Sequence, residues 1–546
     1  TAAAEGVSAR PMWLPVLPDN LYIDSIGDMY PGSGFGYYHS AEIAVYDAPE
    51  KQEQKILSVS PLDEGNIVIY GAAGSGKVSF INSMICSFAK KYSPEEVNMY
   101  IIDFGTETLI RMKNIPHIGE IILPSDGSRI RDLFAFIKKQ ADIRKKLFLE
   151  HGGDYKAYCD VKKKLPEIII IINNYSGFSE YAGQLFDTSL LSLGKLGISF
   201  VVTANLVNAL GFSVLQNFKQ KLTMQLNEDT YSLVLGNTGR MLPQHRKGSG
   251  LVRIDNKVYE FQTAFIADRE NQAEYIAELT DALCKKYPDK AAVRIPRLPD
   301  RYTCRNVPSA AVSKLKLKKL PVGLSAVGAS PVYFDFSNDF TVISHKAVFD
   351  NNVVQGMAEL LSMYYHDRLS VLDPFEIFSA GRKDYTYIHG KNEVSEYIDS
   401  AFDEALFRHN NYNDAVRNSQ EPPVYEEKAI FFCGINRLMN SLDAVTKEKL
   451  VNMFDKVGSR HGLRYIIYEK FNELYTLSSV ASFSERRNTN SFIWVGAGYN
   501  EQNVFTYIKT NEKTDELENS GFVVSGKKLS FVRLICSEEV KEQDNE

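Results

Sequence analysis

Residues 66–86 read NIVIYGAAGSGKVSFINSMIC: a short apolar run, a glycine-rich turn ending in lysine, and an apolar segment with helical spacing. The run at 66–70 is typical of a buried strand, and the segment from Ser79 is typical of a helix. Glycines between them allow backbone N–H groups to converge on an anion, and the helix N-terminus adds partial positive charge. The stretch therefore predicts a phosphate-binding loop, whose contacting residues are Gly71, Ala72, Ala73, Gly74, Ser75, Gly76, Lys77, Val78 and Ser79.

Two positions depart from the usual phosphate-loop pattern. Val78 has no oxygen where a Ser or Thr hydroxyl normally ligates Mg²⁺, and Ser79 is turned away by about 100° on a helix. The apolar run 167–172 leads into Asn173 and Asn174, where an acid normally holds the water shell of the metal. We therefore expect ATP to bind in this half with weak or absent Mg²⁺, no metal-ligating residues and negligible hydrolysis. A relic loop that binds nothing is the alternative.

The chain carries an internal repeat. Residues 14–19 (LPVLPD) return as residues 295–300 (IPRLPD). Strand-like segments also recur in the same order, at 66–70, 167–172 and 197–202 in the first half and at 340–344, 428–433 and 462–467 in the second. Apolar strands that alternate with longer helical segments belong to buried parallel sheets. The predicted fold class is therefore α/β, doubly wound, in two homologous modules.

A helix and a histidine of the first half are also expected from local pattern. Residues 129–149 have helical spacing, with apolar side chains at Leu133, Phe136, Ile137 and Ile143. His117 lies in a Pro-His-Ile-Gly stretch, and we expect a hydrogen-bonded structural histidine there rather than an acid or base.

The phosphate loop is replaced in the second half. Residues 343–352 read ISHKAVFDNN, with no glycine and no Gly-Lys pair. Val348 and Phe349 are bulky and would block the close approach of a phosphate. The run 428–433 is followed by Gly-Ile-Asn, again without a carboxylate. We expect no conventional nucleotide binding in this half.

Composition and charge exclude several classes of protein. Hydrophobic residues make up 44% and charged residues 24% of the 546 residues, as in ordinary globular domains. The net charge is −6 without a long basic run, which argues against a dedicated nucleic-acid-binding protein. The 6 cysteines are scattered, so neither a zinc site nor a disulfide framework is predicted. The longest apolar run, 168–172, is too short to span a bilayer, and any membrane segment is expected upstream of Thr1.

Six short motifs outside the phosphate loop occur in an order that is typical of one family of ATPases. They are DAPEKQEQ at 47–54, DFG at 103–105, PHIG at 116–119, TAN at 203–205, GSGLV at 248–252 and EFQ at 260–262. With the phosphate loop, they make the chain similar to the EssC/EccC family of type VII secretion ATPases, of the FtsK/SpoIIIE class. The resemblance covers nearly the whole chain, more faintly after residue 320. It implies two tandem RecA-like P-loop NTPase modules, each a mostly parallel sheet flanked by helices, with Asn205 as a γ-phosphate sensor and Asn173 and Asn174 at a degenerate Walker B position.

The resemblance also implies domain limits and a function. An extension or linker (1–40), the family's second ATPase module (41–285), a linker (286–314) and the third module (315–546) are expected. The pair would belong to a membrane-bound secretion motor, on the cytoplasmic side of the membrane. It would recruit substrates and regulate the upstream catalytic module.

Expected partners are secreted helical-hairpin substrates, the other ATPase modules of the same chain and other secretion-system subunits. A hexamer is one option for the full-length protein, and DNA is not expected. The alternatives are a fragment of an FtsK-type DNA translocase and a nucleotide-independent interaction scaffold. The translocase needs the hydroxyl and the acid that Val78 and Asn173 lack, and the scaffold would not bind nucleotide at Lys77.

Overall fold

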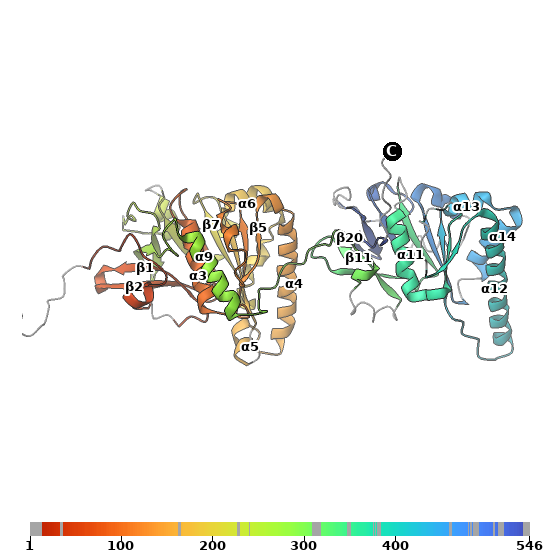
Figure 1. Ribbon diagram of the computed structural model, residues 1–546, viewed down its shortest axis with the longest axis horizontal. Coiled ribbons are helices and arrows are strands. Elements are labelled where there is room, and N and C mark those ends of the chain that lie inside the picture. The colour runs from red at the N-terminus through yellow and green to blue at the C-terminus, as the bar shows by residue number, and fades with distance from the viewer. Residues whose placement is uncertain are drawn as a thin grey trace, which may run out of the picture. The chain divides into compact units, whose positions relative to one another are not determined.

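The computed structural model divides the chain into two compact units, Thr1–Pro296 (unit 1) and Arg297–Glu546 (unit 2), each built on its own ten-stranded sheet (Figure 1). The structure describes residues 14–32, 36–161, 165–226, 230–239, 241–307, 318–346, 351–374, 376, 378, 384–457, 461–478, 480, 483, 491–505, 508–510 and 518–538. No helix in these residues is both long and apolar enough to cross a membrane.

The sheet of unit 1 has a parallel body and an antiparallel extension. The parallel strands run in the order β8 (Phe218–Met224), β3 (Asn66–Tyr70), β7 (Ile198–Ala204), β6 (Glu167–Asn173), β4 (Val97–Asp103) and β5 (Ile118–Ile122). Beyond β8 come the antiparallel strands β9 (Ser249–Ile254), β10 (Lys257–Thr263), β1 (Ala41–Ala48) and β2 (Glu53–Val59). The carboxyl ends of the parallel strands meet at one edge, which is where α/β proteins bind ligands.

Helices cover both faces of this sheet. In Figure 1, α3 (Lys77–Lys91) and α9 (Gln272–Lys286) lie on one side of the sheet, and α4 (Arg129–Leu149) lies on the other with α6 (Tyr175–Ala182). Successive residues of β3 enter opposite cores, because side chains alternate along a strand. This arrangement explains why the parallel strands are apolar at nearly every position. The shorter α-helices are α1 (Ile26–Met29), α2 (Pro61–Glu64), α5 (Tyr155–Val161), α7 (Phe212–Leu215) and α8 (Tyr231–Leu235).

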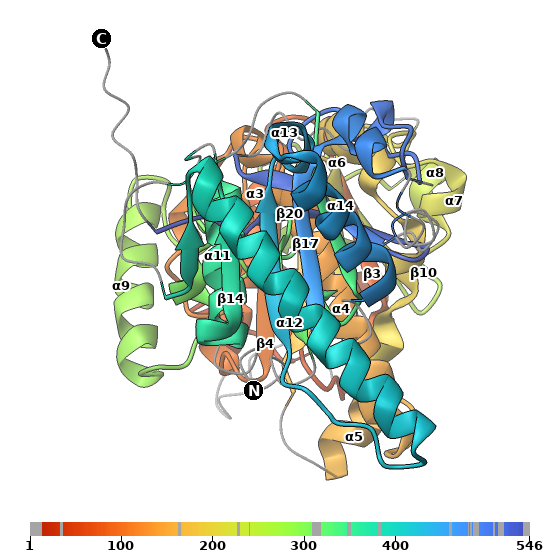
Figure 2. The same cartoon turned by 90° about the vertical axis from the view of Figure 1, so that its right-hand side faces the viewer.

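Unit 2 repeats this strand order. Its sheet runs β12 (Pro331–Asp335), β11 (Lys319–Ser325), β20 (Lys528–Leu534), β19 (Ser520–Ser525), β18 (Ser491–Val495), β13 (Phe340–His345), β17 (Leu463–Lys470), β16 (Lys428–Cys433), β14 (Leu369–Leu372) and β15 (Thr386–Ile388). One face carries α11 (Asn351–Tyr365), and the other carries α12 (Lys391–Arg417), α13 (Ile435–Ser441) and α14 (Ala444–Asn452) (Figure 2). The expectation of two homologous, mostly parallel α/β modules is confirmed.

A buried arginine ties the beginnings of two central strands together in each unit. The guanidinium of Arg144, on α4, donates to the carbonyls of Leu196 (2.7 Å), Gly197 (3.1 Å) and Pro166 (2.6 Å), which precede β7 and β6. In unit 2 the guanidinium of Arg408, on α12, donates to the backbone carbonyls just before β17 (2.9 Å) and β16 (3.1 Å). The repeat therefore extends to individual side chains.

Helix α4 has the predicted bounds, but its inward face differs from the predicted one. Ile143 was expected among the apolar positions, and it is 42% exposed. The next residue, Arg144, is buried instead and donates to the backbone carbonyls that precede β6 and β7. The prediction for Ile143 is wrong because hydrogen bonding, rather than hydropathy, sets which side of this turn faces inward. His117 is hydrogen-bonded as expected, with Nε2 2.9 Å from the carbonyl oxygen of Tyr92; it is also buried, and burial lowers its pKa.

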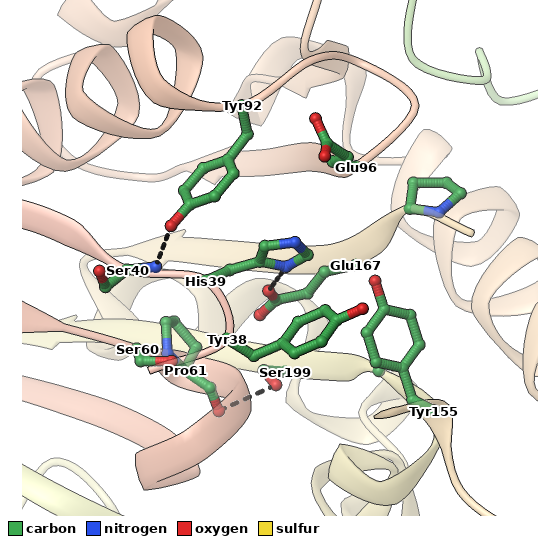
Figure 3. Close-up of polar contacts among 12 residues, drawn as sticks. Tyr38, His39, Ser40, Ser60, Pro61, Tyr92, Glu96, Tyr155, Glu167 and Ser199 are labelled. Atoms are coloured by element: carbon green, nitrogen blue, oxygen red, sulfur yellow. Dashed lines mark hydrogen bonds and ion pairs between the residues drawn. The ribbon is translucent and has the colours of Figure 1, made fainter. Parts of the chain in front are cut away.

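The segment that leads into β1 is held by a buried polar pair. Nδ1 of His39 lies 3.0 Å from Oε2 of Glu167, at the start of β6, and the backbone N–H of Ser40 donates to the hydroxyl of Tyr92 (2.9 Å). Figure 3 shows the His39 ring between Tyr38 and Tyr92, pointing at the carboxylate. Burial raises the pKa of Glu167, and the imidazole opposes this shift. The pair therefore anchors residues 38–40 to the central sheet.

Candidate nucleotide site

The glycine-rich segment forms a loop between β3 and α3, at the carboxyl edge of the sheet. Nζ of Lys77 donates to the carbonyls of Gly71 (2.6 Å) and Ala72 (2.8 Å), so the ammonium closes the loop on itself. Burial lowers the pKa of Lys77 to about 8. Neither acceptor carries a full charge, so a phosphate would be a stronger partner for this buried cation. The loop is thus arranged to receive an anion.

A cavity of about 720 Å³ opens beside the loop. Most of the predicted site residues line it, namely Ala73, Gly74, Gly76, Lys77, Val78, Ser79, Asn173, Asn174 and Asn205. The other three do not: Gly71 and Ala72 supply carbonyls to Lys77, and Oγ of Ser75 faces the sulfur of Met224 at 4.0 Å. The fold therefore brings the loop and the ends of β6 and β7 around one space.

Several residues of the same cavity were not predicted from the sequence. Lys247 comes from the loop before β9, Arg269 from the loop before α9, and Arg111 from the 3₁₀-helix η3 (Thr108–Met112). All three side chains are exposed. No Asp or Glu is among the described residues that line the cavity. Lys247 could have been predicted from the sequence, because it directly precedes the Gly-Ser-Gly motif. No motif next to Arg269 or Arg111 predicts that they line the cavity.

The side chain of Asn173 is part of a buried hydrogen-bond network. Its Nδ2 donates to Oδ1 of Asp103 (2.7 Å), and its Oδ1 accepts from the hydroxyl of Thr203 (2.8 Å). Asp103 also accepts from the backbone N–H groups of Gly105 (3.0 Å) and Leu109 (3.3 Å). From the sequence, Asp103 was expected only as the start of an Asp-Phe-Gly turn. The structure places the carboxylate of Asp103 beside Asn173, the position at which the sequence lacks the usual acid.

Asn174 presents a buried acceptor to the cavity wall. Its backbone is left-handed (φ 66°), a conformation that Asn tolerates better than most residues. The side-chain Nδ2 donates to the carbonyl of Phe104 (2.8 Å), while Oδ1 has no partner among the described residues. Asn82, on α3, also lines the cavity with an unpartnered buried side-chain oxygen. An amide oxygen accepts hydrogen bonds and repels phosphate oxygens, so neither of these buried oxygens would hold a phosphate.

The residues of the cavity do not fit a magnesium ion. Mg²⁺ prefers an octahedral set of oxygens that includes carboxylates. Val78 presents a half-buried apolar side chain to the cavity, Asn173 is engaged on both sides of its amide, and no described lining residue is acidic. Ser79 also lines the cavity, but it follows the position at which this class of loop has its metal-ligating hydroxyl. Across the part of the chain that the structure describes, no group of three or more His, Cys, Asp or Glu side chains is placed to hold a metal.

The equivalent edge of unit 2 has a different chemistry. The ring of His345 is buried and stacked on Tyr468 at 4.9 Å, and burial lowers its pKa to about 4. Nζ of Lys346 pairs with Glu501 at 2.5 Å. Val348 and Phe349, which were predicted to block phosphate, lie outside the described residues.

Comparison with known proteins finds one family model and several similar proteins. The model of the FtsK/SpoIIIE family matches residues 40–227. The ESX secretion system protein YukB of Bacillus subtilis is 26% identical over 552 residues, which cover 96% of this chain and 36% of YukB. The chain thus spans about a third of the length of the curated relatives it matches.

Two solved structures match over nearly the whole chain. EssC (ATPases 2 and 3) from Geobacillus thermodenitrificans has a TM-score of 0.77 at 24% identity, covering 96% of this chain and 100% of that one. Thermomonospora curvata EccC (ATPases 2 and 3), in complex with a signal sequence peptide, has a TM-score of 0.66 at 20% identity, with the same coverage. Residues 40–227 thus match the FtsK/SpoIIIE family, the chain is similar over nearly its whole length to EssC/EccC secretion proteins, and its two units have the fold of ATPases 2 and 3 in these structures.

Proposed function

We propose that the chain is the pair of C-terminal ATPase modules of a type VII secretion motor, in which unit 1 binds ATP and hydrolyses it very slowly. The observation that carries this proposal is the cavity beside the phosphate loop. Lys77, Lys247, Arg269 and Arg111 line it, and no described lining residue is acidic. Such a cationic wall suits a polyphosphate. Because the described part of the wall has no carboxylate, it also has no group that would orient an attacking water.

The expected loss of turnover follows from two substitutions relative to an active site of this class. Val78 removes a hydroxyl that holds the metal, and Asn173 removes a negative charge. Each lost charge-assisted interaction is worth about 1.5–3 kcal/mol. Together they would slow the chemical step by about 10²–10⁴-fold, at about 1.4 kcal/mol for each factor of ten.

A titration with labelled ATP tests the proposal. We expect saturable binding of ATP to the whole chain and turnover far below about 1 s⁻¹, the low end of ordinary enzymes. Binding should weaken strongly in Lys77→Ala, because the phosphates lose their main buried cation. A chain that bound no nucleotide would instead be the nucleotide-independent scaffold. Turnover at the rate of ordinary ATPases, stimulated by DNA, would favour the translocase.

We further propose that unit 2 recruits secreted substrates. The EccC structure of the same two modules is in complex with a signal sequence peptide, and this complex supports a peptide-binding role for the present chain. Unit 2 also exposes large apolar side chains on the helical layer formed by α12 and α14. Phe407 is 62% and Val445 65% exposed, with Tyr412 and Val416 exposed on α12 as well. Exposed aromatic and apolar groups are the usual anchors for a partner helix.

Similarity to the EssC/EccC proteins supports a wider assignment. We propose an N-terminal extension at 1–40, modules at 41–285 and 315–546, and a linker at 286–314. In the parent protein these modules would contact the upstream catalytic ATPase module and other secretion subunits, with a hexamer as one assembly. The parent would place them on the cytoplasmic side of the membrane through an upstream transmembrane part. Co-purification of the chain with the upstream part of its parent, and loss of that association at high salt or after mutation, would test these contacts.

A further inference from the structure

We propose that Lys247 and Arg269 take the place of the magnesium ion, so that the cavity of unit 1 holds a metal-free nucleoside triphosphate. This inference rests on the proposed nucleotide site and identifies how its charge is balanced. A divalent ion normally offsets two charges of the bound triphosphate. Two cationic side chains supply the same charge, and both line the cavity whose walls do not fit the metal.

The backbone of Lys247 is clamped against the phosphate loop. The N–H of the next residue, Gly248, donates to the carbonyl of Ser75 (2.9 Å). Nε2 of the buried Gln262 donates to the carbonyl of Lys247 itself (3.0 Å). Contact here is so close that a Cβ on Gly76 would lie 2.7 Å from the nitrogen of Gly248. These contacts therefore fix the backbone of Lys247 beside the phosphate loop.

The two cations differ from their neighbours in their ionic contacts. Among the described residues, no ion pair involves Lys247 or Arg269. The neighbouring Arg246 does have partners: its guanidinium donates to the carbonyl of Leu17 (2.5 Å) and to Asp19 (2.8 Å), outside the cavity. Cations that face a shared cavity with no carboxylate on its described walls are arranged for an external anion.

Arg111 also lines the cavity, but its position is less suited to this role. It lies on η3 and borders a second hollow, whose walls include Asp281 on α9. Arg111 therefore borders a hollow whose walls include a carboxylate, as well as the cavity whose described walls have none. We therefore assign the metal-replacing role to Lys247 and Arg269.

The two halves of the chain provide an internal comparison. Gly250 on β9 pairs with Met224, the last residue of β8, and Gly521 on β19 pairs with Val495, the last residue of β18. Because the strand orders are identical, these glycines occupy the same place in the two sheets. Three residues before each glycine stand Lys247 in unit 1 and Glu518 in unit 2. The unit whose sequence lacks a phosphate loop thus has the opposite charge at the position that corresponds to Lys247.

The experiment measures ATP affinity of the whole chain by calorimetry, in excess EDTA and in excess Mg²⁺. For the wild type we expect the two affinities to agree within about threefold. Lys247→Met and Arg269→Met should each lower the affinity in EDTA by about tenfold, as expected for one charge-assisted contact. The double variant should lose about 100-fold. AMP, which lacks the outer phosphates, should bind the variants and the wild type alike.

Two controls make the outcome specific. Lys285→Met removes one exposed charge from α9 outside the cavity and should leave the affinity unchanged. Lys247→Arg keeps the charge and should retain the affinity within about threefold. A wild type that binds ATP only with Mg²⁺, or a double variant that binds ATP in EDTA as tightly as the wild type, would overturn the inference and leave the nucleotide site intact. Absence of nucleotide binding in both buffers would overturn the proposed function itself.

Discussion

Nδ2 of Asn173 lies 2.7 Å from Oδ1 of Asp103, so the acid at this edge of the sheet stands on β4, one strand away from the usual position on β6. Its carboxylate is engaged by that amide and by the backbone N–H groups of Gly105 and Leu109. Asp103 thus positions Asn173 and the loop that carries Arg111, and it does not line the cavity. Unit 2 keeps an acid at the equivalent strand end: Oδ2 of Asp373 accepts from the backbone N–H of Phe378 at 2.9 Å and from the hydroxyl of Tyr387 at 2.8 Å. The shared role is to hold the segment that follows the strand.

Replacing Asn173 with Asp should destabilise unit 1 by about 2 kcal/mol at pH 7, because two carboxylates would meet in a buried site. One of them would then have a raised pKa in the folded state. A raised pKa means that the folded state binds an extra proton, so the variant should regain stability as the pH falls from 7 towards 4. Urea unfolding at several pH values measures this. The exchanged pair Asp103→Asn with Asn173→Asp keeps one acid and one amide, and should restore most of the stability.

Hydrolysis should return only when both missing groups are supplied. The exchanged pair moves the acid to β6, and Val78→Thr adds the hydroxyl that ligates Mg²⁺. We expect the triple variant to turn over ATP at least about tenfold faster than the wild type with Mg²⁺, and neither part alone to do so. Phosphate release assays with and without EDTA make the comparison. Equal rates in all variants would mean that another group limits the reaction.

ATP affinity should fall at alkaline pH through the titration of Lys77. Burial lowers the pKa of this lysine to about 8, and only the protonated form attracts phosphate. Below that pH the cation is present, and above it each further pH unit should cost up to about tenfold in affinity. Titrations between about pH 7 and pH 9.5 check this. Lys77→Met should bind weakly with a flat profile over the same range, and a wild type with an equally flat profile would contradict the assignment.

Arg144→Met should destabilise unit 1 by about 3 kcal/mol, because buried carbonyls below β6 and β7 lose their charged donor. Lys145→Met is the matched control. Its side chain is 61% exposed and its ammonium pairs with Asp142 at 3.8 Å, and exposed pairs contribute about 0–1 kcal/mol. Chemical denaturation of the two variants should separate them clearly. Similar stabilities would show that the carbonyls find other partners.

A chain that ends at Pro296 should keep ATP binding and lose substrate capture. Unit 1 has its own cores on both faces of its sheet, so it is expected to fold without unit 2. Binding of a labelled signal-sequence peptide and of a whole helical-hairpin substrate is compared between the full and shortened chains. Full affinity in the shortened chain would place the receptor in unit 1. A polar substitution at Phe407 in the full chain tests the exposed layer directly, because this side chain contributes little to the core.

The sequence by itself determined the two modules, the phosphate loop and the missing hydroxyl at Val78. These features depend on residues that are neighbours along the chain, since a strand, a turn and a helix are specified by local spacing and by glycine. The order of the repeated segments was enough to predict two similar sheets, and the bounds of α4 followed from its pattern. The prediction from local pattern was wrong for Ile143, because the burial of Arg144 depends on carbonyls 22 to 53 residues away.

Only the tertiary structure decided what surrounds the loop. Asp103 and Asn173 are 70 residues apart, and no local pattern states that their side chains meet. The remaining parallel strands separate Lys247 from the phosphate loop along the chain. Lys247 lies at the cavity because β9, which follows it, pairs with β8, and β8 pairs with β3. Strand pairing brings such residues together through backbone hydrogen bonds that carry no side-chain signature. The cationic wall of the cavity is therefore a product of the sheet order, whereas the loop itself is a product of the adjacent residues 71–77.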